Sequence, residues 1–180
     1  ELLLRKFSPQ QLRSCSCFVN IISSTPNNFI AYTKERNSII TMVCELIKST
    51  NMKYHFDIMS KLEEMLKSDK FTFENDEARL MTSKLILKAA DMGSLNRSED
   101  LSSTEGIVDD FFSEGDYMKL SGIVFSNDKS NERKDIHWVD SLPAFLREVL
   151  GPTYDLLSRL LPELTPMNET VKERIEKIIK

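Results

Sequence analysis

Apolar residues recur every three or four positions along most of the chain, which is the spacing of one face of an α-helix. In residues 34–48, for example, Ile39, Val43 and Leu46 fall on one such face. A break is expected at Gly151 and Pro152. The helices that this spacing predicts span residues 34–48, 52–68, 77–90, 102–117, 138–150, 153–161 and 165–180.

One predicted helix differs from the others because it is apolar nearly all round. Residues 77–90 read EARLMTSKLILKAA. A helix with this composition is usually central and buried, so we expect Leu85, Ile86 and Leu87 to be largely buried. Gly93 offers a C-terminal stop.

Neither β-alternation of useful length nor an internal repeat is found, and the sequence therefore predicts an all-α, multi-helix fold. With 180 residues, the chain fits a single domain over 1–180 that needs no disulfide or metal to form a core. Its 5 glycines and 6 prolines are too few for collagen or for a turn-dense sandwich.

Charge and cysteine content exclude several classes of protein. The chain has 24 basic and 28 acidic residues without a basic stripe, which argues against nucleic-acid binding. It lacks the apolar run of about 18 to 20 residues that membrane insertion requires. Cys15, Cys17 and Cys44 are an odd number, as expected of reduced thiols in an intracellular, cytoplasmic protein. Because the chain starts at Glu1 without Met, we expect an internal piece of a longer polypeptide.

Asp91 is the most informative candidate for chemistry. It ends the apolar helix, where a carboxylate opposes the helix dipole at a cost of about 0.3–1 kcal/mol. In apolar surroundings it also needs a cation or hydrogen-bond donors. Two readings stay open: Asp91 binds a metal ion, or it enters the turn ending at Gly93 and faces water.

The other candidate ligands do not form a site by spacing. His55 is expected to be a structural histidine with its hydrogen bonds made, and His137 to pack on Trp138. Cys15 and Cys17 lack the two further ligands of a zinc site. P-loop, GxSxG and GxGxxG motifs are absent from the sequence.

Three segments together resemble the class I 3′,5′-cyclic nucleotide phosphodiesterases. Residues 49–56, STNMKYHF, resemble the family's (A/S)TDMxxHF stretch. Residues 85–97, LILKAADMGSLNR, resemble LLLKCADISNPTR, and residues 110–122, DFFSEGDYMKLSG, resemble EFFxQGDxEKxxGL. The likeness covers residues 30–162, which leaves 1–30 as a divergent start and 163–180 as a terminal helix.

The resemblance implies an all-α catalytic domain of the HD type. Its site would hold zinc and magnesium bridged by a hydroxide, which attacks the cyclic phosphate to give a 5′-nucleotide. By resemblance, Asp91 takes the place of a metal-ligand aspartate. Met52, Met92 and Phe145 fall on the substrate pocket, with Phe145 on the purine-clamping phenylalanine.

The departures from the family pattern concern its catalytic residues. The upstream histidine and the HDxxHxxxxN motif are absent from this chain, and residues 5–14 lack the acid and both histidines of the family's NDxSxLExHH stretch. Asn51 replaces the aspartate of TDM, and Ser94 replaces a nucleotide-contacting asparagine. Leu142 stands in place of the purine-clamping glutamine.

These observations predict a degenerate phosphodiesterase-like domain that is non-catalytic in this chain and has a structural or regulatory role in signal transduction. One alternative is an active enzyme hydrolysing cAMP or cGMP, with its missing ligands on an upstream segment. Another is an unrelated helical interaction module. We expect no cofactor in the chain as given, and zinc and magnesium only in a complete family site. Expected partners are an upstream segment or another protein, with cyclic nucleotide as a possible ligand.

Overall fold

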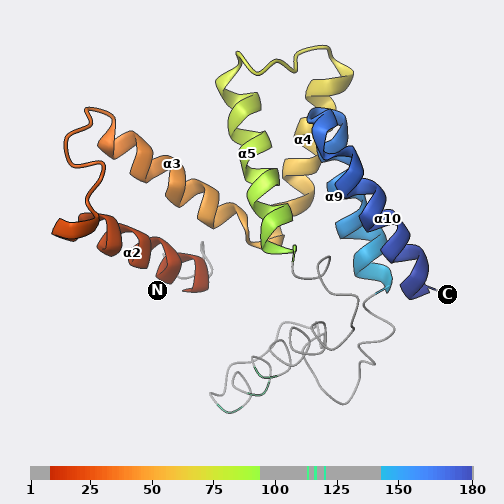
Figure 1. Ribbon diagram of the computed structural model, residues 1–180, viewed down its shortest axis with the longest axis horizontal. Coiled ribbons are helices and arrows are strands. Elements are labelled where there is room, and N and C mark those ends of the chain that lie inside the picture. Colours follow the sequence, from red (N-terminus) through yellow and green to blue (C-terminus); the bar gives the residue numbers. More distant parts are fainter. Residues whose placement is uncertain (1–8, 94–112, 114–115, 117–119, 121–142, 180) are drawn as a thin grey trace. The chain divides into compact units, whose positions relative to one another are not determined.

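The computed structural model of the protein describes residues 9–93, 113, 116, 120 and 143–179 (Figure 1). Within these residues every regular element is a helix, as predicted, and none is long and apolar enough to cross a membrane. The chain divides into two compact units, Glu1–Asp91 and Met92–Lys180. Most of the predicted helix over 102–117 lies outside the described residues, as do Ser94, His137, Trp138, Leu142 and most of the family-like segment 110–122.

Four α-helices lie within the described residues of the first unit. α2 (Pro9–Ser23) leads through the short 3₁₀ helix η1 (Thr25–Asn27) to α3 (Arg36–Ser49). A second 3₁₀ turn, η2 (Met52–Tyr54), runs directly into α4 (His55–Lys67), and α5 (Asp76–Asp91) returns along α4 (Figure 1). α5 also packs against α3, and α3 against α2.

α5 buries one face only, which corrects the expectation of burial all round. Leu85 is fully buried, Leu87 is half-buried, and Ile86 is 43% exposed, so the prediction for Ile86 was wrong. The buried face follows the helical period and includes polar side chains: Ala78, Thr82, Leu85, Lys88 and Ala89. A lysine therefore occupies a position that the apolar pattern assigns to the core.

α2 was not among the predicted helices, because polar residues interrupt its apolar pattern. Within it, Cys15 and Ile22 are buried. Both lie on a helix that packs against α3. The stretch expected to be a divergent start therefore contains a regular helix.

In the second unit the helix continues through Gly151 and Pro152, where a break was expected. The π-helical turn η3 (Leu146–Leu150) leads into α9 (Gly151–Leu160), and α10 (Thr165–Ile179) packs on both after the 3₁₀ turn η4 (Pro162–Leu164). Pro152 lies in the first turn of α9, where the N–H that proline lacks is not needed for a helical hydrogen bond. A Cβ on Gly151 would lie 3.1 Å from Ile175 Cδ1, so glycine permits the close approach of α10.

Candidate functional site

The side chain of Lys88 organises the polar centre of the first unit. It is fully buried on α5, and its Nζ donates three hydrogen bonds to the turn that follows α3. The acceptors are the carbonyl oxygens of Ser49 at 3.0 Å, Thr50 at 3.0 Å and Asn51 at 2.9 Å. An ammonium group has three donors, so all of them are used. A cation at the C-terminal end of α3 also complements the helix dipole.

Two opposing effects set the protonation of Lys88. Burial lowers the pKa of the ammonium to about 8, and the negative charge of Asp91 acts to raise the pKa. At neutral pH the group is therefore still mostly charged. The three carbonyl oxygens supply the polar partners that a buried charge requires.

His55 begins α4 directly after this turn and is fully buried. Burial, with a smaller effect of the Lys88 charge, lowers the pKa of His55 to about 4, so the ring is neutral at pH 7. Neither ring nitrogen has a hydrogen-bond partner among the described residues. The expectation of a structural histidine with its hydrogen bonds made was therefore wrong. The ring instead packs edge-to-face with Phe56, with the ring centroids 5.0 Å apart.

Asn51 stands where the resemblance places an aspartate, and its side chain has a local structural role. The Oδ1 atom accepts a hydrogen bond from the backbone N–H of Lys53 at 2.9 Å, which caps η2. Met52 follows and is 40% exposed. The hydrogen bonds of Lys88 thus hold the Asn51–Met52 turn against α5. Lys88 itself lies one helical turn before Asp91 on α5.

Asp91, the predicted metal ligand, is the exposed last residue of α5. A catalytic zinc ion normally takes three protein ligands. Among the described residues, no group of three histidine, cysteine or acidic side chains could hold a metal ion. The donors in this part of the chain therefore do not fit the family's metal pair. Of the predicted pocket residues, Met92 is buried and Phe145 half-buried, and both belong to the second unit.

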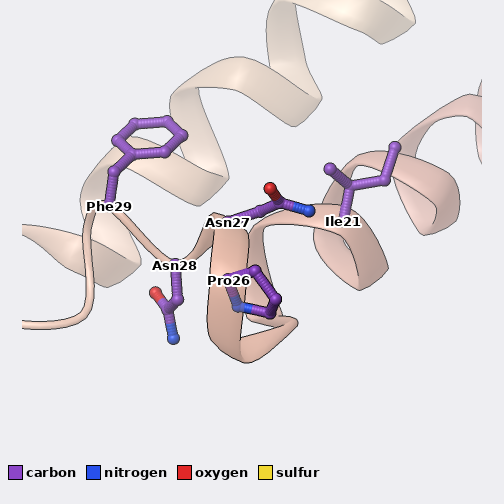
Figure 2. Close-up of a pocket in the computed structure, with 5 residues that line it drawn as sticks. All are labelled: Ile21, Pro26, Asn27, Asn28 and Phe29. Atoms are coloured by element: carbon purple, nitrogen blue, oxygen red, sulfur yellow. The ribbon is translucent and has the colours of Figure 1, made fainter.

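Two pockets are formed by the described residues, and Asp91, Met52, Met92 and Phe145 line neither of them. One, of about 470 Å³, follows α2 and is lined by Ile21, Pro26, Asn27, Asn28 and Phe29 (Figure 2). None of these side chains titrates, so the pocket has no evident acid–base chemistry. The other, of about 350 Å³, includes Ser49 and Tyr54 of the family-like segment 49–56 in its lining. Its charged lining residues are Glu45, Lys48, Asp57, Lys61 and Lys84.

Sequence reasoning gave Lys88 no role, although it lies inside a family-like segment. The signal available was a single lysine within the apolar run LILKAA. A long side chain with a charged end often reaches solvent from such a position, so the pattern does not distinguish a buried lysine from an exposed one.

Comparison with known proteins supports the resemblance. The chain is similar to a cGMP-specific 3′,5′-cGMP phosphodiesterase 3 of Dictyostelium discoideum, with 26% identity over 89% of this chain and 35% of that protein. It is also similar to a dual 3′,5′-cyclic-AMP and -GMP phosphodiesterase beta of Plasmodium falciparum, with 28% identity over 71% of this chain and 11% of that protein. The chain thus spans about a third or less of the length of these relatives.

A family model matches most of the chain. Its description is 3′5′-cyclic nucleotide phosphodiesterase, and it matches residues 5–171, a range that includes α2 and most of α10. This match overturns the alternative of an unrelated helical module. The chain belongs to the 3′,5′-cyclic nucleotide phosphodiesterase family.

Proposed function

We propose that this chain is a phosphodiesterase-family domain that does not hydrolyse cyclic nucleotides by itself and has a structural or regulatory role. The observation that carries the proposal is the donor set around Asp91. That carboxylate is the family's metal-ligand aspartate by resemblance, and it is not part of a three-ligand group among the described residues.

The neighbouring positions support the same conclusion. The amide of Asn51 is engaged with the Lys53 N–H, and His55 is buried away from solvent. Residues 5–14 offer no acid or histidine where the family has both. One carboxylate cannot hold zinc against water, and the family's nucleophile depends on metal to form at neutral pH.

A non-catalytic domain still has to keep its fold, and the residues around Lys88 serve that purpose. Three hydrogen bonds from one buried ammonium join α5 to the end of α3. The exposed side chains of Met52 and Phe56 lie on the segment that follows the residues accepting these bonds. In this proposal, the segment presents a surface for a cyclic nucleotide or a partner.

Zinc titration of the purified chain, followed by isothermal calorimetry, tests the proposal. We expect no stoichiometric zinc binding, and the same heat from the Asp91→Asn variant, which keeps the size of the side chain and removes its charge. One zinc per chain that disappears in Asp91→Asn would contradict the proposal.

The second candidate function is an active phosphodiesterase whose other metal ligands lie on a segment outside this sequence. The coverage of the relatives favours it, since this chain spans 35% of the Dictyostelium protein and 11% of the Plasmodium protein. Hydrolysis of cAMP or cGMP by the longer polypeptide, lost on Asp91→Ala, would support this candidate.

A further inference from the structure

Two of the three cysteines meet across the packed helices α2 and α3. The Cys15 thiol on α2 donates to the carbonyl oxygen of Cys44 on α3, with 3.6 Å between Sγ and O. Cys15 is 8% exposed and Cys44 is half-buried, whereas Cys17 is exposed. The Cys15 sulfur therefore lies beside the backbone of the residue that carries the second thiol.

The electrostatics of Cys15 are affected by the residues of α3 that lie beside it. Burial raises the pKa of the Cys15 thiol, and a side-chain hydrogen bond with Cys44 raises this pKa further. The ammonium of Lys48, one helical turn after Cys44 on α3, acts in the opposite direction. The pair belongs to no three-ligand metal group among the described residues, so a redox role is the chemistry that two adjacent thiols offer.

We propose that Cys15 and Cys44 form a reversible thiol–disulfide pair, which links α2 covalently to α3 when the protein meets a hydroperoxide. The proposal is independent of catalysis, because neither cysteine belongs to a segment that the resemblance assigns to the site.

The reaction proceeds in two steps. The hydroperoxide first oxidises Cys44, the more exposed thiol of the pair; an S–O bond forms, the O–O bond breaks, and water or an alcohol leaves. The Cys15 thiolate then attacks the Cys44 sulfur, so that an S–S bond forms, the S–O bond breaks and water leaves. The two thiols lose two electrons in total, and the peroxide gains them. A thiol reductant restores both cysteines.

The disulfide would link the two helices that precede the carbonyl groups bound by Lys88. α2 begins within the segment that corresponds to the family's acid- and histidine-bearing stretch, and α3 ends at the carbonyl groups bound by Lys88. Because the second step requires the Cys15 thiolate, whose pKa is raised, disulfide formation should be faster at higher pH.

The test uses the full chain carrying Cys17→Ser, which keeps the pair and removes the exposed thiol. The protein is treated with hydrogen peroxide at low micromolar concentration, alkylated, and digested without reduction for peptide mass spectrometry. We expect one intramolecular Cys15–Cys44 cross-linked peptide in most of the protein, reversed by dithiothreitol, and a higher Tm for the oxidised form. Cys15→Ser and Cys44→Ser, each combined with Cys17→Ser, should lose the cross-link.

Alkylation of both thiols after peroxide treatment, or separate oxidation of each to sulfinic acid, would overturn the proposal. Circular dichroism checks that every variant is helical. If Cys17→Ser does not fold, the wild-type chain is used instead. A cross-link that joins Cys17 to either other cysteine, in place of Cys15–Cys44, would then overturn it.

Discussion

The Nζ atom of Lys88 lies 3.0 Å from the carbonyl oxygen of Ser49, the last residue of α3, although the two residues are 39 positions apart. Two further carbonyl groups, of Thr50 and Asn51, bind the same ammonium. One side chain on α5 thereby fixes the direction in which the chain leaves α3. That direction determines where the Asn51–Met52 turn and the start of α4 lie.

Replacement of Lys88 by methionine should destabilise the first unit by about 3 kcal/mol. Methionine has a similar length but no donors, so three carbonyl groups lose a charged partner, and each such loss costs on the order of 1–3 kcal/mol with partial compensation by water. Urea unfolding followed by circular dichroism measures the change.

Lys67→Met is the matched control for that experiment. Lys67 is on α4, where its exposed side chain lies 3.7 Å from Glu63. Surface changes of this kind usually stay within about 0.5 kcal/mol. If Lys88→Met and Lys67→Met lowered the free energy of unfolding equally, the hydrogen bonds of Lys88 would contribute no more to stability than a surface lysine does.

His55 should make the stability of the protein fall in mild acid. Its folded pKa of about 4 is below the ordinary value of 6.5, so between these pH values the unfolded chain binds more protons than the folded one. The contribution of His55 is complete above pH 6.5 and is lost as the pH falls towards 4, with a slope of up to about 1.4 kcal/mol per pH unit.

Urea unfolding at pH 7, 6 and 5 tests this dependence by comparing wild type with His55→Leu. The variant should show a flatter pH profile, whereas His137→Gln, which changes the other histidine of the chain, should follow the wild type. A pH profile for His55→Leu that parallels the wild type would contradict the assigned pKa.

Neighbouring positions on α5 should respond differently to truncation. Leu85 is fully buried, and Leu85→Ala should cost about 2–5 kcal/mol by loss of buried methyl groups and creation of a cavity. Ile86 is 43% exposed, and Ile86→Ala should cost less than about 1 kcal/mol. Chemical denaturation of the two variants measures both values. The opposite order would mean that the helix buries its other face.

Helical periodicity predicted much of the fold because amphipathic helices repeat their apolar residues at a fixed spacing. The helices expected over 34–48 and 52–68 correspond to α3 and to η2 with α4. The expected break at Gly151 and Pro152 did not occur. The π-turn runs directly into α9, and Pro152 lies in the first turn of α9. The close approach of α10 to Gly151 could not be predicted either, since it is a contact between residues far apart in the chain.

The candidate site was harder to predict from the sequence than the helices were. Asp91 was identified by its position at the end of α5 and by resemblance, and it is exposed at that position. The burial of Lys88 and the unpartnered ring of His55 depend on contacts between residues far apart in the chain. Such contacts produce no periodic pattern in the sequence. A lysine among apolar residues can also extend its charged end to solvent, so its burial is not predictable from the pattern.

A turnover assay on the purified chain tests most directly whether the chain hydrolyses cyclic nucleotides. Cyclic AMP and cyclic GMP are each incubated with the protein in the presence of zinc, magnesium or manganese, and the 5′-nucleotide is quantified by chromatography. The Asp91→Ala variant, purified in the same way, controls for contaminating phosphodiesterase. We expect no 5′-nucleotide above the level of this control. Turnover by the wild-type chain that disappears in Asp91→Ala would contradict this expectation.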